Sequence, residues 1–303
     1  MSDSARPAVP ASLTALLAEI GPTWGQNVPA NVKRMAEEFS KIHASAPPTT
    51  RVTRDVAYGP HERQQFDIFH PENATPGHPL VIFIHGGAFT EGHRNRNEHI
   101  YSNVSHYFAR HGMSGINMNY RLAPESKFPG ASQDIATVVH WARDNAAVHG
   151  WSADRIFLMG HSAGGAHAAS YAYDKRIHGA AGPQIAGLMV ISGRVRADLL
   201  PENPNAKKVA AYYGDDASKL DDMSAVSHVA ADSVPTFIAM AQYENPLIDL
   251  YCTELAYRLA QVKRHTPPLL WVRGHNHSSM VGHINTAEDG LGAALRAFIA
   301  DPS

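Results

Sequence analysis

Residues 155–167 read RIFLMGHSAGGAH, an apolar run that turns through glycines into a segment of small residues. At its centre, GHSAG (160–164) has the pattern G-x-S-x-G between an expected strand and an expected helix. Such a sharp turn strains the backbone at the serine, so its neighbours have to be small. The turn also lifts the hydroxyl clear of the sheet, near the positive end of the following helix. We expect Ser162 to be a nucleophile; the alternative is a glycine-rich structural turn.

Outward from this turn, apolar strands alternate with helical segments from residue 80 to the C-terminus. The strand candidates include LVIFI (80–84) before the turn, and VPTFIAM (234–240) and PPLLWV (267–272) after it. Strands that alternate with helices imply parallel crossovers. The pattern therefore predicts an α/β fold with a mostly parallel central sheet, covered by helices on both faces.

The segments before this alternating region, and one segment that interrupts it, suggest how the chain is organised. Residues 1–50 have helical periodicity and are expected to form an N-terminal helical cap segment, with the catalytic domain over 51–303. Two alternating stretches, 51–59 and 64–71, favour an antiparallel pair of strands. Residues 194–232 are polar, rich in Asp, Asn and Lys, and interrupt the rhythm. We expect them to form a cap-like insertion over one end of the sheet.

Composition narrows the class of protein. The chain has 303 residues, with 44% hydrophobic and 18% charged residues, as in a globular protein with a sizeable core. The net charge of −2 indicates neither a nucleic-acid nor a membrane partner. Cys252 is the only cysteine, so an intrachain disulfide is excluded. Because apolar runs are short and a signal-peptide pattern is missing, we expect a cytoplasmic protein.

A serine that attacks an acyl carbon creates an oxyanion, which needs hydrogen-bond donors aimed at it. The backbone N–H of Ala163, directly after the nucleophile, is one candidate. IHGGAF (84–89) supplies two more, Gly86 and Gly87, just after a strand end, although two glycines there could also form a plain turn. His85 is expected to anchor this loop rather than to act as a base.

The general base is expected in a loop near the C-terminus. RGHNHSSM (273–280) offers two histidines directly after a strand. We prefer His277, because His275 abuts the strand end and is expected to pack against the loop. With His283 nearby, these histidines could instead bind a metal. We expect no metal, because no carboxylate or cysteine cluster accompanies them at ligand spacing.

The acid should follow the strand between the serine turn and the histidine loop. MAQYENPLIDLY (240–251) occupies that position. Glu244 is the preferred acid, and Asp249, in the expected next helix, is the alternative. A shift of one residue would place Asn245 there, and an amide cannot stabilise a charged imidazolium as a carboxylate does.

Together these segments resemble the α/β-hydrolase superfamily, and within it the carboxylesterases related to hormone-sensitive lipase. The resemblance runs from about residue 55 to the C-terminus. HGGAF stands where that family has an HGGG-type oxyanion loop, and GHSAGG matches its serine turn. NYRLAPESKFPGASQD (119–134) and YYGDDASKLDDMSAVSHV (212–229) are similar to further family segments. The resemblance implies an α/β-hydrolase fold, with site residues as follows: a triad of Ser162, Glu244 and His277, and oxyanion donors on Gly86, Gly87 and Ala163.

The chain departs from that family at Ala88, which replaces the fourth glycine of the oxyanion loop. The change should narrow the space beside the oxyanion without removing its donors.

Three charged residues of the 119–134 segment, Arg121, Glu125 and Asp134, could contact a substrate. We expect them instead to form structural ion pairs, because loop charges beside a core usually satisfy one another.

The leading expectation is a serine carboxylesterase that needs no cofactor and hydrolyses small carboxylic esters through an acyl-enzyme. An arylformamidase-type amidase is the alternative, because YGPHERQQFDIFHP (58–71), HGG and GHSAGGAH resemble those enzymes as well. A non-catalytic binding homologue is disfavoured by the intact serine turn and by His277. Phe89, Trp24 and Tyr212 are candidate substrate-lining residues. A homodimer is possible.

Overall fold

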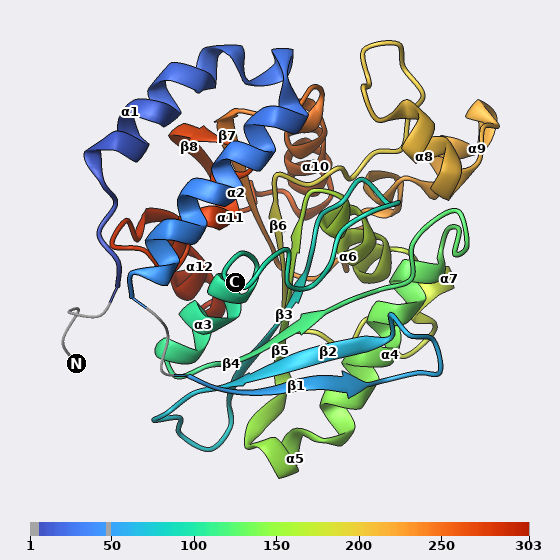
Figure 1. The fold of residues 1–303 in the computed structure, drawn as a ribbon. Coiled ribbons are helices and arrows are strands. Elements are labelled where there is room, and N and C mark those ends of the chain that lie inside the picture. Colours follow the sequence, from blue (N-terminus) through green and yellow to red (C-terminus); the bar gives the residue numbers. More distant parts are fainter. Residues whose placement is uncertain (1–5, 47–49, 303) are drawn as a thin grey trace.

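The structure, a computed structural model, describes residues 6–46 and 50–302 (Figure 1). Residues 47–49, which lie just before the boundary expected between the cap segment and the catalytic domain, are outside the described residues. An eight-stranded sheet has the order β1-β2-β4-β3-β5-β6-β7-β8. Its strands are β1 (Arg51–Ala57), β2 (Gln65–His70), β3 (His78–Ile84), β4 (Ser114–Met118), β5 (Trp151–His161), β6 (Gly187–Ile191), β7 (Thr236–Tyr243) and β8 (Leu269–Asn276).

The sheet is mixed at one edge and parallel elsewhere. β1 pairs with β2 antiparallel, and β2 pairs with β4 antiparallel. From β4 through β3, β5, β6 and β7 to β8, every pair is parallel. The expected antiparallel pair and the mostly parallel sheet are therefore confirmed. In a parallel array the carboxyl ends of the strands meet at one edge, which is where the loops after β3, β5, β7 and β8 converge.

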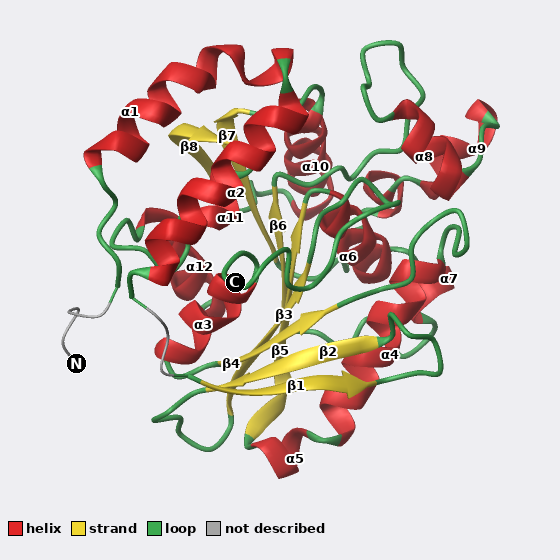
Figure 2. Cartoon of the chain, in the orientation of Figure 1, coloured by secondary structure: helices red, strands yellow, loops and turns green. Residues whose placement is uncertain are grey.

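Helices cover both faces of the sheet, as Figure 2 shows. They are α1 (Ala11–Ile20), η1 (Gly21–Gln26), α2 (Val28–Ala44), α3 (Ser102–Arg110), α4 (Gly130–Asp144), α5 (Ala146–His149), α6 (Ala163–Tyr173), α7 (Lys175–His178), α8 (Ala206–Tyr213), α9 (Ala217–Met223), η2 (Ala225–His228), α10 (Ile248–Lys263), α11 (Ser279–Gly282) and α12 (Gly290–Ala300). Residues of α4, α6 and α10 share one core, and residues of α1, α2, α3 and α12 share the other.

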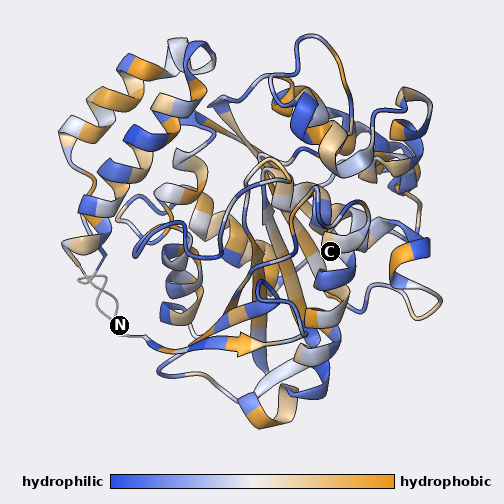
Figure 3. Ribbon diagram, turned by 45° about the vertical axis from the view of Figure 1, so that its right-hand side comes forward, coloured by the Kyte–Doolittle hydropathy of each residue, from blue (hydrophilic) through white to orange (hydrophobic). Residues whose placement is uncertain are grey.

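Strand β3 shows how the two cores are separated. Leu80, Ile82 and Ile84 belong to the core under α4 and α6, while Val81 and Phe83 belong to the core under α2 and α3. Successive side chains of a strand point to opposite faces, so a strand covered on both sides has to be apolar throughout. Figure 3 shows central strands that are largely hydrophobic and surrounding helices that carry both hydrophobic and hydrophilic residues. Each buried aliphatic side chain contributes about 1.5–3 kcal/mol.

The N-terminal helices and the 194–232 segment lie beside the sheet end where the parallel strands finish (Figure 1). Helix α2 contacts α11, and η1 contacts both β7 and β8. In the second segment, Val209 and Tyr212 of α8 and Val226 of η2 are buried in the α4–α6 core. Both segments are therefore anchored by apolar contacts rather than loosely appended. Within the described residues, no helix has the length and apolarity to cross a membrane.

Two buried carboxylates of the fold, Asp67 and Asp134, are paired with arginines. Arg94 is almost fully buried and donates from Nε to Asp67 at 3.0 Å, with Asp67 fully buried on β2. Arg121 donates from Nε and from a terminal nitrogen to Asp134, the shortest contact being 2.7 Å. Glu125 lies 3.2 Å from the ring of His61. Arg121 and Asp134 form the expected ion pair, whereas Glu125 is 76% exposed and contacts the ring of His61 at the surface.

Candidate active site

The serine turn has the conformation that the sequence pattern requires. β5 ends at His161, α6 begins at Ala163, and Ser162 between them has φ 57° and ψ −121°. A Cβ atom at Gly164 would lie 2.2 Å from the carbonyl oxygen of Ile84, and one at Gly160 would lie 2.4 Å from the carbonyl oxygen of Gly164. Both contacts are too short for any side chain. The glycines therefore allow the strand and the helix to approach closely enough to hold the serine in this strained turn.

Ser162 is half-buried at the N-terminus of α6, where unpaired backbone N–H groups favour developing negative charge. Its Oγ forms no hydrogen bond with any described residue. Catalytic contacts of a free enzyme commonly tighten only when substrate is bound. The hydroxyl is thus free to rotate toward a base or an acyl carbon.

Glu244 and His277 form a buried pair. Oε2 of Glu244 lies 2.6 Å from Nδ1 of His277, and the two side chains are only 3% and 5% exposed. The other carboxylate oxygen, Oε1, accepts from Ser192 Oγ at 2.5 Å and from the backbone N–H of Ala241 at 2.8 Å. Donation from Nδ1 to the carboxylate leaves Nε2 as the basic nitrogen of the ring. A carboxylate in this position orients the ring and stabilises its charged form.

The residues considered as alternatives to Glu244 lie elsewhere. Asn245 accepts a hydrogen bond through Oδ1 from Trp24 Nε1 at 2.8 Å. Asp249 is exposed in the first turn of α10. Of the acids and amides in this stretch, Glu244 alone is hydrogen-bonded to His277 within the described part of the chain.

The loop that carries His277 is supported by His161, which the sequence reasoning did not single out. His161 Nε2 donates to the backbone carbonyl of His277 at 3.0 Å, and the two rings are 4.8 Å apart. Burial lowers the pKa of His161 well below its usual value, so the ring stays neutral. The residue directly before the nucleophile therefore links the serine turn to the histidine loop. Ser192, which holds Glu244, was also missed, because a serine after a strand carries no motif.

The glycine loop after β3 lies against the nucleophile. A Cβ atom at Gly86 would be 3.0 Å from the Cβ of Ser162. The N–H groups of Gly86 and Gly87 donate to no atom of the described chain, and Ala163 is the first residue of α6. At Gly87, φ is 144° and a Cβ would lie 1.9 Å from the carbonyl oxygen of Glu91. These three positions can thus offer backbone donors close to Ser162.

His85 anchors this loop, as expected. The ring is fully buried, and its Nδ1 lies 2.7 Å from the carbonyl oxygen of Gly86. It stacks on Tyr120 at 4.4 Å, and the Tyr120 hydroxyl donates to the His85 carbonyl at 2.9 Å. Burial lowers the pKa of His85 to about 3, so the ring stays neutral. Its contacts are those of a side chain that anchors the loop, as expected, and not those of a base for Ser162.

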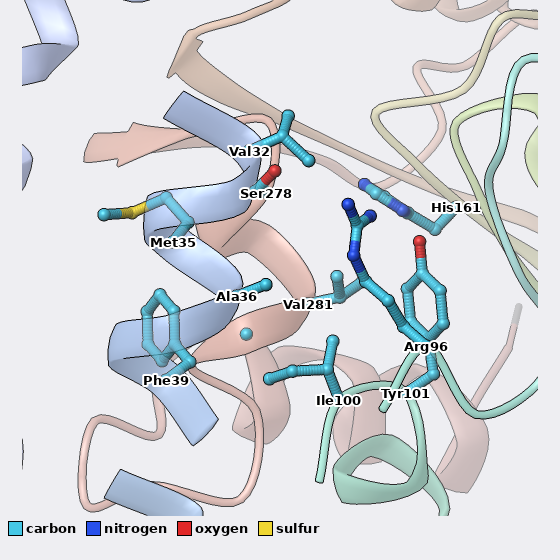
Figure 4. Close-up of a pocket in the computed structure, with 11 residues that line it drawn as sticks. Val32, Met35, Ala36, Phe39, Arg96, Ile100, Tyr101, His161, Ser278 and Val281 are labelled. Atoms are coloured by element: carbon cyan, nitrogen blue, oxygen red, sulfur yellow. The ribbon is translucent and has the colours of Figure 1, made fainter. Parts of the chain in front are cut away.

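A small cavity lies beside the serine turn, between α2 and the histidine loop (Figure 4). Its volume is about 20 Å³, room for about one water molecule. Val32 and Ala36 of α2 face it from one side, and His161, the residue before Ser162, lies across from them, with Ser278 of the histidine loop also in its lining. The N-terminal segment therefore helps to enclose the site. A larger cavity of about 720 Å³, lined by Arg110, Arg155 and Arg296 among others, includes none of these residues.

The three candidate substrate-lining residues are all buried, each about 1% exposed. Phe89 and Tyr212 are stacked at 5.2 Å beneath the glycine loop, with His167 against both. Trp24 is held by Asn245. Their positions show packing roles, and a role in lining the substrate site stays a prediction.

The remaining histidines of the loop form a separate cluster. His275 Nε2 lies 2.7 Å from Oε1 of Glu288, and the rings of His275 and His283 are 4.4 Å apart. His283 is buried, which lowers its pKa to about 4. Among the described residues, His275, His283 and Glu288 form the group whose ligand atoms are close enough for a metal.

The chain is similar to a family model and to several known proteins. A family model described as BD-FAE matches residues 66–281. A probable isoprenylcysteine alpha-carbonyl methylesterase of Arabidopsis thaliana is 29% identical over 119 residues, 39% of this chain and 24% of that protein. An arylesterase of Saccharolobus solfataricus is 39% identical over 98 residues, 32% of this chain and 31% of that protein.

Among solved structures, the hyperthermophilic esterase from the archaeon Pyrobaculum calidifontis has a TM-score of 0.71 at 21% identity. The alignment covers 97% of this chain and 98% of that one. This likeness confirms the expected α/β-hydrolase fold. The two curated relatives are matched over less than a third of their own length, so their names describe those proteins and not this one.

Proposed function

Because the chain belongs to the BD-FAE family of α/β-hydrolases, we propose that it is a serine carboxylesterase that hydrolyses small carboxylic esters through an acyl-enzyme on Ser162. The observation that carries this proposal is the buried contact of 2.6 Å between Glu244 and His277. This pair lies in the loops after β7 and β8, at the sheet end where Ser162 follows β5. A structural turn alone would not require a buried carboxylate–imidazole pair at that place.

The proposed reaction gives each of these groups one role. His277 Nε2 takes the proton of the Ser162 hydroxyl as Oγ attacks the ester carbonyl carbon. The carbonyl oxygen becomes an oxyanion, which the N–H groups of Gly86, Gly87 and Ala163 can stabilise. His277 then gives the proton to the departing alcohol, and an acyl-enzyme remains. Water, deprotonated by the same ring, releases the acid and restores Ser162.

Glu244 acts through His277 in this scheme. Its carboxylate favours the imidazolium that forms in each transition state and keeps Nδ1 protonated in the neutral ring. Ser192 and the Ala241 N–H hold the second oxygen, which prevents the carboxylate from rotating away.

The test is covalent labelling combined with turnover. A fluorophosphonate probe should label the wild-type protein on Ser162, and Ser162→Ala should lose both the label and hydrolysis of short p-nitrophenyl esters while it keeps the folded circular-dichroism spectrum. Ser218→Ala, at an exposed serine of α9, is the matched control and should keep both. Unchanged ester turnover in Ser162→Ala would refute the proposal, as would a wild-type protein that is neither labelled nor active.

Substrate class is decided in the same assay. N-formylkynurenine tests for hydrolysis of an N-formyl amide, because the same triad can cleave that bond. We expect kcat/KM for the short esters to exceed that for N-formylkynurenine. The reverse order would retain the mechanism on Ser162 and replace the ester substrate by a formamide.

A further inference from the structure

His275, Glu288 and His283 converge from three separate pieces of the chain. His275 is the second-last residue of strand β8, His283 follows α11, and Glu288 lies just before α12. One ligand atom from each lies within 4.8 Å of the others. The histidines are 4% and 1% exposed, whereas the Glu288 side chain is 43% exposed. The cluster is therefore a buried pair of rings with a carboxylate on its solvent side.

Hydrogen bonding leaves each ring a nitrogen that can serve as a ligand. His283 Nδ1 lies 2.6 Å from the carbonyl oxygen of Ser279, and only the protonated nitrogen can donate to it. Its Nε2 consequently carries the lone pair, and it has no hydrogen-bond partner in the described chain. A ring oriented by a backbone carbonyl through one nitrogen, with the other nitrogen free, is the usual arrangement of a metal-binding histidine.

His275 is held in the same way by a hydroxyl. Ser279 Oγ lies 3.0 Å from the carbonyl oxygen of Asn276, to which it can only donate, and it accepts from the N–H of Asn276 at 2.9 Å. In that arrangement Oγ accepts from His275 Nδ1, 2.9 Å away. His275 Nε2 then carries a lone pair that faces the Glu288 carboxylate at 2.7 Å. Two acceptors 2.7 Å apart require a proton between them, and a metal ion can replace that proton if the two atoms move apart.

From this geometry we propose that His275 Nε2, His283 Nε2 and the Glu288 carboxylate bind one divalent transition-metal ion of the Zn²⁺ class. Zn²⁺ accepts imidazole and carboxylate ligands with bonds of about 2.0–2.2 Å, which places ligand atoms about 3.4 Å apart in a tetrahedron. The half-exposed Glu288 can adjust to that spacing, and the solvent side leaves a fourth position for water.

The ion would stabilise the loop of the candidate base rather than take part in the reaction. His275 precedes His277 by two residues, and His283 and Glu288 close the same loop on its far side. A metal that joins all three cross-links β8 to the segment before α12. Because His277 itself is paired with Glu244, catalysis does not pass through the ion.

The experiment uses the full chain after treatment with a chelator and dialysis. Titration with Co²⁺ should produce the visible absorption bands of a tetrahedral site, and metal analysis after dialysis against Zn²⁺ should give one ion per chain. When the free Zn²⁺ concentration is a hundred times Kd, the melting temperature of the protein should rise by on the order of 5 °C. The chelated protein should keep its ester turnover below its melting transition.

Matched variants locate the ion. Glu288→Gln should weaken binding at least about 10- to 100-fold, the loss that removal of even a supporting partner causes. His61→Gln is the control, since His61 lies 3.2 Å from Glu125 in a similar histidine–carboxylate pair to which the structure assigns no third ligand. It should bind metal as the wild type does. His277→Gln should also retain the ion.

Three results would overturn the proposal. The first is a wild-type chain that holds far less than one ion and shows no melting shift at micromolar free metal. The second is binding that Glu288→Gln leaves unchanged. The third is binding that His277→Gln abolishes, which would place the ion on the Glu244–His277 pair. The first result would also show that a proton joins His275 to Glu288.

Discussion

Trp24 donates a hydrogen bond from Nε1 to Oδ1 of Asn245 at 2.8 Å, across 221 residues of sequence. This contact connects η1 of the N-terminal segment to the residue beside Glu244. It holds the amide away from His277 while the neighbouring carboxylate faces the ring. The N-terminal segment therefore helps to determine which side chain of the loop meets the histidine.

The first prediction concerns Trp24. Trp24→Phe keeps an aromatic ring but removes the donor, which leaves the Asn245 oxygen without this bond. We expect a loss of about 1–3 kcal/mol in the free energy of unfolding, measured by urea denaturation. Trp271→Phe is the control, because Trp271 is 50% exposed, and it should change stability by less than about 0.5 kcal/mol. Equal effects of the two substitutions would contradict a structural role for the Trp24–Asn245 bond.

The second prediction concerns the identity of the acid. Glu244→Gln should reduce kcat for a short ester by roughly 10²- to 10⁴-fold, since an amide cannot stabilise the imidazolium. Asp249→Asn should leave kcat near the wild-type value, because Asp249 is exposed in α10. Steady-state kinetics on both variants provides the measurement. If Asp249→Asn were the more damaging change, the acid would have to be Asp249.

The third prediction concerns the serine turn. A methyl group at Gly164 would meet the Ile84 carbonyl, so Gly164→Ala should cost about 1–3 kcal/mol of stability and displace Ser162. Thermal unfolding and fluorophosphonate labelling would show both effects. Gly25→Ala is the control, because no atom lies within 4 Å of a Cβ there. Normal labelling of Gly164→Ala would show that the turn tolerates a side chain.

The fourth prediction concerns the buried ion pair on β2. Asp67 accepts from Arg94 Nε, from Asn95 Nδ2 at 2.7 Å and from the N–H of Asp55 at 2.9 Å. Asp67→Ala leaves the buried Arg94 guanidinium with the exposed Asp55 as its carboxylate partner, and should destabilise the fold by about 3 kcal/mol.

An ion pair on the surface serves as the comparison for the destabilisation expected of Asp67→Ala. Lys175 and Asp232 lie 2.8 Å apart with both side chains about two-thirds exposed. Asp232→Ala should therefore cost less than about 1 kcal/mol in the same denaturation experiment. A cost for Asp67→Ala no larger than that would mean that the Arg94 charge finds another partner or water.

The fifth prediction concerns Cys252, the single cysteine. It is fully buried in α10, and burial raises the pKa of its thiol. Because the thiolate is the reactive form, iodoacetamide should not label the native protein and should label it after denaturation in guanidinium. Labelling of the native protein at the denatured rate would show that α10 opens readily.

Much of the fold could be predicted from local sequence patterns. An apolar strand covered on both sides reads as an unbroken run, as in LVIFI, and the G-x-S-x-G turn has its own steric requirements. The chain order of serine, acid and histidine also followed from these patterns. What they did not reveal was the support around the site, since the His161 contact with the His277 carbonyl and the Ser192 contact with Glu244 each join distant segments.

The sequence by itself thus determined the mostly parallel sheet, the strained serine at residue 162 and the two loops in which an acid and a base would lie. Only the tertiary structure decided the side-chain directions within those loops. Glu244 rather than Asn245 faces His277, and Glu288 reaches His275 across 13 residues. The physical reason is that periodicity encodes which residues are buried, whereas the direction of a loop side chain is set by partners that folding brings from elsewhere in the chain.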